Sequence, residues 1–298
     1  MTIDENNYEK AQHFIECLPY VRRWHGKTIV VKYGGNAMIN EELKEAVLKD
    51  IILMNLIGIR TVLVHGGGPA IEDYLKRLDI KSDFKSGLRV TNEAVMETVS
   101  MVLVGKINQN TVSEINRLGG KAVGLSGKDG AMMKCKKKFA RVMDGDKVRQ
   151  IDIGMVGEVE SFDNTIINNM LNDNYIPVIA PIGTDENGGT YNVNADYAAG
   201  KIAAALGAEK LFLLTDVEGI FRDFNDKNSL ISTIKSTEMP QLIKDKVICK
   251  GMIPKVESCM KAIEGGVNGV HIIDGRVPHS ILLELFTDSG VGTMVTKE

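Results

Sequence analysis

Two short segments constrain the fold of this chain most strongly, because each is an apolar, β-branched run that ends in glycines. They are residues 29–35, IVVKYGG, and residues 62–69, VLVHGGGP. Each precedes a stretch with the apolar spacing of a helix, at 40–57 and 69–78. Glycine lets backbone N–H groups approach an anion closely, and a helix N-terminus adds partial positive charge. Two such strand ends predict a site where two anionic groups meet.

Composition excludes several classes of protein. The chain has 298 residues, of which 44% are hydrophobic and 25% charged, and its formal net charge is −3. These values are ordinary for a soluble globular protein of one large or two smaller domains, and they do not indicate a general nucleic-acid or membrane surface. The basic run 134–138 with Arg141 is interpreted as a solvated hairpin.

The sequence contains no signal for export or for a membrane. No secretory segment begins the chain, and no apolar run is long enough to span a bilayer. Four cysteines, at positions 17, 135, 249 and 259, lack the spacing of zinc ligands. We therefore expect a cytoplasmic protein with free thiols and no protein-held metal.

The order of the expected elements predicts an α/β fold with an open, mainly parallel central sheet between helices and with β-hairpins over the site. Hairpins are expected at 81–90 and within 130–160. A boundary between two halves is placed at 183, where a glycine-rich loop begins. The expected strands are 28–33, 61–65, 121–125, 175–180, 210–215 and 269–273. The expected helices are 8–24, 40–57, 69–78, 92–117, 163–172, 195–206, 237–245, 252–264 and 278–287.

Neither a Walker A loop nor a dinucleotide fingerprint is present, so the glycine-ended strands belong to neither type of phosphate site. Two lysines outside those motifs are candidates for phosphate chemistry. Lys32 ends the first strand, at the sheet edge where α/β folds bind ligands, although a surface lysine is the alternative. Lys255 follows Pro254 at the opening of a helix, where the helix dipole disfavours a cation. The three glycines at 66–68 form either a tight turn or an anion cradle.

Polar residues also precede the expected helix 195–206, in the segment 192–196, NVNAD. Asn194 or Asp196 could simply cap that helix. Alternatively, the two amides and the carboxylate could bind a polar ligand and orient lysines. The sequence leaves both interpretations open.

Six blocks in this order resemble the amino acid kinase family over about residues 27–295: VVKYGGNA, VLVHGGGPAI, SGLRVT, YNVNADYAA, LLTDVEGI and KGMIPKVE. SGLRVT and NVNAD are similar to the branch that phosphorylates the side-chain carboxylate of N-acetyl-L-glutamate in arginine biosynthesis. The resemblance implies ATP, carried with Mg²⁺, as the phosphoryl donor. It also implies that residues 26–182 form a lobe for acetylglutamate binding and dimerisation, and that residues 183–298 form an ATP-binding lobe with an effector site.

The same resemblance implies roles for individual residues. Lys32 and Lys255 would neutralise the transferred phosphoryl group, and Asp196 would orient both lysines. The acetylglutamate-binding residues would be Gly67, Gly68, Arg89, Asn192 and Asn194, with Arg89 on the α-carboxylate. The nucleotide-binding residues would be Gly34, Gly35, Asp216, Gly219 and Gly251. A carboxylate is already nucleophilic, so no strong base is needed and His65 is expected to have a positioning role.

A second resemblance concerns regulation. The N-terminal segment 1–25 and the block 270–294 are similar to the arginine-sensitive members, in which such a helix links dimers into a hexamer that is a trimer of dimers. The residues implied to line an arginine effector site are Tyr20, Lys210, His271, Glu284 and Gly290. The alternative is that helix 8–24 packs only on its own subunit.

Two other functions stay open at this point. One is a kinase of the same family that acts on carbamate, aspartate, glutamate or UMP, which Arg89 within SGLRVT argues against. The other is a catalytically idle amino-acid-binding regulator, which the presence of Lys32, Asp196 and Lys255 together argues against.

Overall fold

A computed structural model describes residues 5–38, 40–144, 147–249 and 252–297 of the chain. Within them, an eight-stranded sheet has the order β12-β14-β13-β11-β1-β2-β8-β5. Its neighbouring strands are parallel, apart from β13 with β14. The predicted fold class is therefore confirmed. The strands are β1 (Thr28–Tyr33), β2 (Arg60–His65), β5 (Ala122–Ser126), β8 (Ile176–Ala180), β11 (Lys210–Thr215), β12 (Thr233–Lys235), β13 (Gly269–Asp274) and β14 (Thr293–Thr296).

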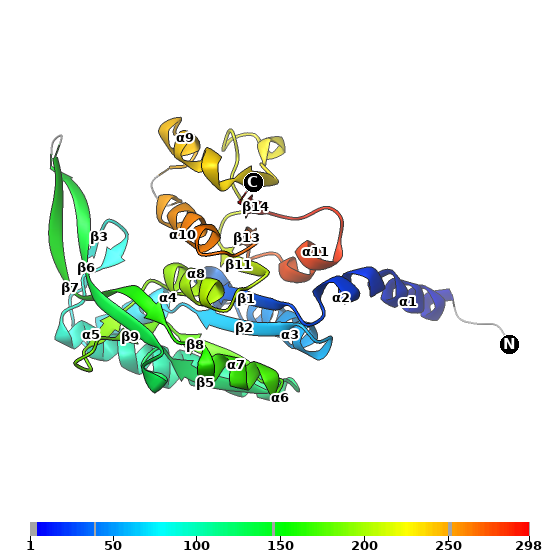
Figure 1. Ribbon diagram of the computed structural model, residues 1–298, viewed down its shortest axis with the longest axis horizontal. Coiled ribbons are helices and arrows are strands. Elements are labelled where there is room, and N and C mark those ends of the chain that lie inside the picture. Colours follow the sequence, from blue (N-terminus) through cyan, green and yellow to red (C-terminus); the bar gives the residue numbers. More distant parts are fainter. Residues whose placement is uncertain (1–4, 39, 145–146, 250–251, 298) are drawn as a thin grey trace.

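Helices cover both faces of this sheet (Figure 1). Alternate side chains of one strand enter different cores, because Val30 packs in one apolar cluster while Ile29 and Val31 pack in another. The first cluster is covered by α7 (Thr165–Asn172), α8 (Ala195–Ala205) and α10 (Ile253–Glu264), and the second by α3 (Glu41–Leu56), α6 (Gln109–Arg117) and α11 (Ser280–Phe286). Burial on both faces explains why the central strands are continuously apolar.

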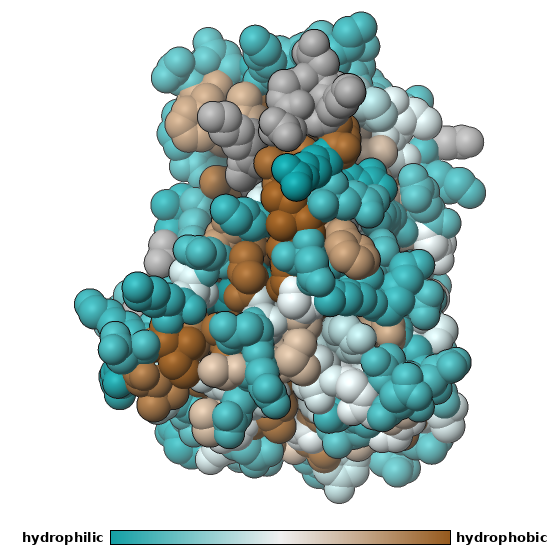
Figure 2. Space-filling view, turned by 90° about the vertical axis from the view of Figure 1, so that its left-hand side faces the viewer, coloured by the Kyte–Doolittle hydropathy of each residue, from teal (hydrophilic) through white to brown (hydrophobic). Residues whose placement is uncertain are grey.

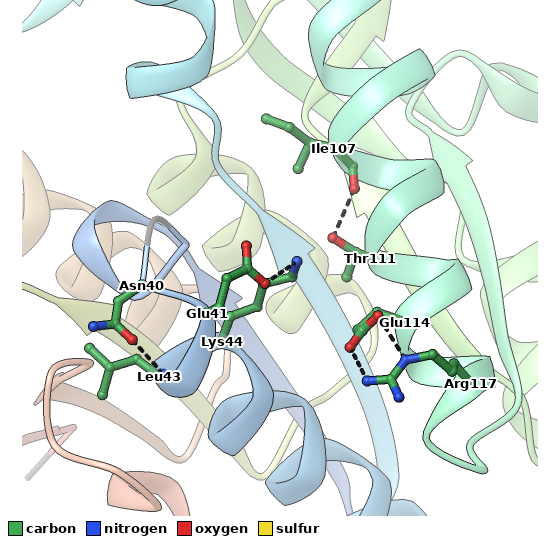
Figure 3. A network of polar contacts seen from close by, with 8 residues as sticks. All are labelled: Asn40, Glu41, Leu43, Lys44, Ile107, Thr111, Glu114 and Arg117. Atoms are coloured by element: carbon green, nitrogen blue, oxygen red, sulfur yellow. Dashed lines mark hydrogen bonds and ion pairs between the residues drawn. The ribbon is translucent and has the colours of Figure 1, made fainter.

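Helix α3 shows how local sequence sets an element's start. The Asn40 side chain accepts a hydrogen bond from the Leu43 N–H, as Figure 3 shows, and Glu41 and Glu42 occupy the first turn. The cap satisfies an otherwise unpaired N–H, and the acidic side chains interact favourably with the helix dipole. Two further helices, α4 (Gly68–Arg77) and α9 (Met239–Lys244), also match their predicted positions.

Hairpins flank the sheet, as expected. A small barrel has the order β10-β7-β6-β9, and a two-stranded sheet pairs β3 (Phe84–Lys85) with β4 (Leu88–Arg89). The barrel strands are β6 (Met133–Asp144), β7 (Lys147–Phe162), β9 (Ile182–Thr184) and β10 (Thr190–Asn192). The long β6–β7 hairpin projects from the body in Figure 1. Figure 2 views the molecule from this side and shows apolar side chains gathered in a band between polar ones.

The basic run 134–138 lies on β6, as predicted for a solvated hairpin. Lys136 and Lys137 are exposed and pair with carboxylates of the adjacent strand β7, Glu160 and Asp152. All four cysteines are free. None of the described helices has the length and apolar character needed to cross a membrane.

Some predicted elements are divided in the structure. The expected helix 8–24 is two helices, α1 (Glu5–Glu16) and α2 (Leu18–Trp24), because Pro19 has no N–H for an intrahelical bond. The expected helix 92–117 contains α5 (Glu93–Ser100) and α6 joined by a π-helical segment, η2 (Met101–Asn108). The short strands β12 and β14 were not predicted, because three or four residues carry little periodicity.

Candidate active site

The two glycine-ended strands are neighbours, so their glycine loops lie side by side at the carboxyl edge of the sheet. β1 and β2 are parallel neighbours, and the Gly66 N–H donates to the Tyr33 carbonyl at 2.7 Å. Gly35 has a φ of +70°, and a Cβ there would lie 2.8 Å from Asp216 Oδ1. A Cβ on Gly34 would lie 2.7 Å from Lys32 Nζ. The positive φ favours glycine at position 35, and a Cβ at position 34 would displace the Lys32 ammonium.

A cavity of about 290 Å³ opens between these loops and the hairpins. Its walls come from both halves of the chain and from the β3–β4 and β6–β7 hairpins. Eight predicted site residues line it: Lys32, Gly34, Gly35, Gly67, Gly68, Arg89, Asn192 and Asn194.

Two lysines from opposite halves of the chain meet on one buried carboxylate. Lys32 Nζ lies 2.9 Å from Asp196 Oδ1, and Lys255 Nζ donates to Asp196 Oδ2 at 2.9 Å. Burial by itself would raise the pKa of Asp196, but the two ammonium groups outweigh it and lower that pKa below its usual range. The carboxylate therefore stays ionised and holds both lysines in fixed positions.

Arg89 is buried beside the glycine loops, with its side chain 6% exposed. One guanidinium nitrogen donates to Glu72 Oε1 at 2.5 Å and to Ser82 Oγ at 2.6 Å, and the group lies 4.6 Å from the Phe84 ring centroid. These partners were not predicted. The expected hairpin held a signal for one of them, since a two-residue turn at Ser86 and Gly87 pairs Phe84 with Arg89.

The two asparagines of the NVNAD segment have distinct positions. Asn194 caps α8, because its side chain accepts from the Tyr197 N–H at 3.1 Å, so the capping alternative is correct for this residue. Asn192 Nδ2 lies 3.3 Å from Thr91 Oγ1. Asp196 belongs to the first turn of α8 and points its carboxylate at the two lysines.

The expected nucleotide residues are only partly gathered at the cavity. Asp216 follows β11 and lies against Gly35. Gly219 is not among the residues that line the cavity. Its φ is +153°, and a Cβ there would lie 2.7 Å from Thr293 Oγ1 and 2.8 Å from Leu230 Cδ1, so backbone conformation and packing account for glycine there. Gly251 lies outside the described residues.

The five expected effector residues gather around α11. His271 Nδ1 lies 2.8 Å from Glu284 Oε1, and a Cβ on Gly290 would be 2.7 Å from the same oxygen. Burial lowers the pKa of Lys210 and of His271. Tyr20, from α2, donates its hydroxyl hydrogen to Asp288 at 2.7 Å.

The chain belongs to the amino acid kinase family, whose model matches residues 27–274. The acetylglutamate kinases of Pelotomaculum thermopropionicum and Heliobacterium modesticaldum are each 55% identical to it, over 97% of this chain and 99% and 98% of theirs. The protein is therefore an enzyme of the same type as these relatives, a kinase.

Solved structures share the fold. The N-acetylglutamate synthase of Neisseria gonorrhoeae, complexed with coenzyme A and N-acetyl-glutamate, is 28% identical with a TM-score of 0.82, over 97% of this chain and 63% of that one. The same synthase complexed with coenzyme A and L-arginine is 27% identical with a TM-score of 0.78, over 97% and 65%. Carbamate kinase from Giardia lamblia bound to AMP-PNP is 16% identical with a TM-score of 0.64, over 92% and 99%, which shows the fold alone.

Proposed function

We propose that this enzyme transfers the γ-phosphoryl group of ATP to the side-chain carboxylate of N-acetyl-L-glutamate in the cytoplasm, giving N-acetylglutamyl 5-phosphate for arginine biosynthesis. One observation carries the proposal. Lys32 lines one cavity together with both glycine loops and the buried Arg89, and its ammonium is held with that of Lys255 on the Asp196 carboxylate. The acetylglutamate kinases at 55% identity support the choice of acceptor.

The charges of the cavity suit a reaction between two anions. A carboxylate oxygen of the acceptor attacks the γ-phosphorus, the bond to the β-phosphate oxygen breaks, and ADP leaves without any proton being removed. Lys32 and Lys255 neutralise charge on the transferred group, and the Gly67 and Gly68 N–H groups face the reacting carboxylate. Mg²⁺ enters with ATP as part of the substrate. Arg89 can donate two parallel hydrogen bonds to the α-carboxylate.

The two lobes would divide the substrates between them. Residues 26–182 supply the second glycine loop and Arg89 for the acceptor, and also Gly34 and Gly35 for the phosphates of the nucleotide. Residues 183–298 supply Asp216, beside Gly35, for the nucleotide. Asn192 and Asn194 reach the acceptor from the start of the second lobe. This arrangement leaves the transferred phosphoryl group at the junction, where Lys32 and Lys255 come from different lobes.

Trapping the acyl phosphate with hydroxylamine tests the acceptor directly. The purified enzyme is supplied with MgATP and with N-acetyl-L-glutamate, L-glutamate or L-aspartate in parallel. We expect hydroxamate only with N-acetyl-L-glutamate. Hydroxamate only with glutamate or aspartate would assign a different kinase of the family, and none with any acceptor would support an idle binding protein.

The cluster around α11 fits an arginine effector. Glu284 is 9% exposed in its side chain. Burial raises its pKa, but His271, the Val291 N–H and Lys210 together outweigh burial and lower it, so the buried carboxylate is ionised and can attract a guanidinium. α2 is bound to the same region, since Trp24 Nε1 donates to the Leu285 carbonyl at 2.9 Å. The related synthase has been solved with L-arginine. Arginine would inhibit if it prefers one of two global states.

Glu284→Gln should weaken arginine binding by about 10- to 100-fold, because it removes a charged hydrogen-bond acceptor with little change of shape. The measurement is the shift of the melting temperature with increasing L-arginine, with L-citrulline as the uncharged control ligand. Glu264→Gln, on the exposed end of α10, is the control variant. An arginine response of Glu284→Gln equal to that of the unmodified enzyme would remove the site from this cluster.

Helix α1 fits a role in linking dimers into a hexamer. It extends away from the body in Figure 1. Its apolar residues Tyr8, Phe14 and Ile15 are 62%, 80% and 64% exposed. A stripe of this kind is stabilised when a partner buries it, and the same helix of a second subunit offers the matching surface.

Phe14→Asp should convert the hexamer to dimers while leaving activity unchanged, because a charge placed in an apolar contact opposes association. Phe224→Asp is the matched control, since Phe224 is 81% exposed and lies on another part of the chain. Light scattering on a sizing column gives the mass of each assembly. The idea fails if Phe14→Asp elutes at the same mass as the unmodified enzyme.

A further inference from the structure

His65 is buried beside the first glycine of the second loop. Its Nδ1 lies 2.8 Å from the Gly66 carbonyl oxygen, and its Nε2 lies 3.2 Å from the side-chain amide nitrogen of Asn108. Burial lowers the pKa of His65 to about 4, so its ring is neutral at pH 7. The Asn108 amide nitrogen is a donor, so Nε2 accepts and the single ring hydrogen is on Nδ1. This assignment follows from the hydrogen-bond network, and it makes Nδ1–H a donor to Gly66.

The bond to Gly66 has a consequence for the next residue. In a planar trans peptide the carbonyl and the following N–H point in opposite directions. A Gly66 carbonyl held against His65 therefore directs the Gly67 N–H away from the buried ring. Gly67 lines the active-site cavity. His65 thus fixes the direction of a backbone donor in the wall of this cavity.

Asn108 is itself anchored to the sheet. Its amide nitrogen also donates to the Val178 carbonyl at 2.9 Å and lies 3.4 Å from the Leu125 carbonyl. A Cβ on Gly124 would lie 2.0 Å from Asn108 Oδ1, so only glycine at that position leaves room for the amide. Strands β5 and β8 therefore hold Asn108 where it meets His65.

The π-helical segment η2 explains how Asn108 reaches this place. In an α-helix, residues five positions apart differ by about 140° around the axis, given 3.6 residues per turn. The i→i+5 hydrogen bonds of a π-helix widen the turn, so Leu103 and Asn108 come nearer to one face. Thr111 also donates to the Ile107 carbonyl at 2.8 Å, at the end of this segment (Figure 3).

The same segment packs directly on the glycine loop. A Cβ on Gly67 would lie 2.4 Å from Leu103 Cδ2 and 2.6 Å from Ile107 Cδ1. Leu103 lines the active-site cavity, whereas Ile107 lines a second cavity of about 200 Å³, and Gly67 borders both. Two apolar side chains thus confine Gly67 while Asn108 and His65 set the orientation of its peptide group.

We propose that Asn108 and His65 are positioning residues for the phosphoryl transfer, and that the π turn exists to place Asn108 on His65 so that the Gly67 N–H points at the acyl acceptor. The identity of that acceptor rests on the proposed function. The positioning itself rests on the contacts among Asn108, His65 and Gly66.

Asn108→Leu should lower kcat/KM for the acceptor by at least about tenfold, because a misdirected loop loses the reactive geometry. The KM for MgATP should stay within about twofold, since the nucleotide is bound mainly by other residues. Asn116→Leu is the matched control, because Asn116 bridges the same helical run to β5 at Ala122 and has no contact with the loop. A purely structural role predicts that both variants lose melting temperature and leave both constants unchanged.

A second measurement does not depend on turnover. The ¹⁵N chemical shifts of the histidine ring in the unmodified enzyme, with His65 identified from the His65→Gln spectrum, should show a neutral ring protonated at Nδ1 at pH 7. A ring protonated at Nε2, or a charged ring, would overturn the proposal. If the unmodified enzyme makes no acyl phosphate from N-acetyl-L-glutamate, the proposed function fails while the tautomer result still stands.

Discussion

Lys255→Ala should lower kcat by about 10²- to 10³-fold, which is the usual effect of removing one group that stabilises transition-state charge. Lys255 Nζ lies 2.9 Å from Asp196 Oδ2, while Lys32 Nζ lies 2.9 Å from the other carboxylate oxygen, Oδ1. The loss of Lys255 leaves one cation where two anions must approach each other. The KM for N-acetyl-L-glutamate should change little, because the proposed mechanism assigns binding of the acceptor to Arg89 and the second glycine loop. Steady-state kinetics with each substrate varied separately is the measurement.

Two variants make that result specific. Lys261→Ala removes a lysine from the same helix α10, 46% exposed and 3.8 Å from Glu158, and should leave kcat within about twofold. Lys255→Arg keeps the charge but replaces a compact ammonium with a larger, planar guanidinium, so it should recover only part of the rate. A Lys255→Ala enzyme with normal kcat would exclude Lys255 from the transfer step.

Arg89→Ala should raise the KM for N-acetyl-L-glutamate by about 10- to 100-fold, which corresponds to the loss of charged hydrogen bonds in a buried place. The KM for MgATP should be unchanged, and kcat should fall far less than in Lys255→Ala. The guanidinium is held by Glu72 and Ser82 before any substrate arrives, so its position is set by the protein. Initial rates over a range of acceptor concentrations give both constants.

The controls for Arg89 separate charge from geometry. Arg77→Ala removes an exposed arginine paired with Asp73 on α4 and should leave both constants unchanged. Arg89→Lys should restore little, since a single ammonium cannot make two parallel bonds to a carboxylate. An Arg89→Ala enzyme with an unchanged KM would mean that the α-carboxylate is bound by other residues.

Much of the fold follows from local patterns. The runs at 28–33 and 210–215 become β1 and β11 with the predicted bounds, because strands buried on both faces are continuously apolar. The break at Pro19 was also available from the sequence, since proline lacks the N–H of a helix interior, but the apolar spacing over 8–24 concealed it.

The candidate site was predicted as a set of residues, and its geometry was not. The sequence places Lys32, Asp196 and Lys255 in separate blocks. The distance of 2.9 Å from each lysine to the Asp196 carboxylate arises only when β1, α8 and α10 pack together. Glu72 and Ser82 carry no motif that marks them as partners of Arg89. The π-helical segment η2 gave no periodic signal, since α-helices that continue on both sides conceal a short stretch of wider turns.

The sequence by itself determined that two glycine-ended strands feed helices and that lysines, a carboxylate and an arginine accompany them, because strand burial and glycine chemistry are local properties. The tertiary structure alone decided the direction of each donor. It placed Asn108 on His65 and turned the Gly66 carbonyl toward that ring. Such contacts join residues far apart in the chain, such as Asn108 and Val178, and they form only when the sheet and the helices pack together.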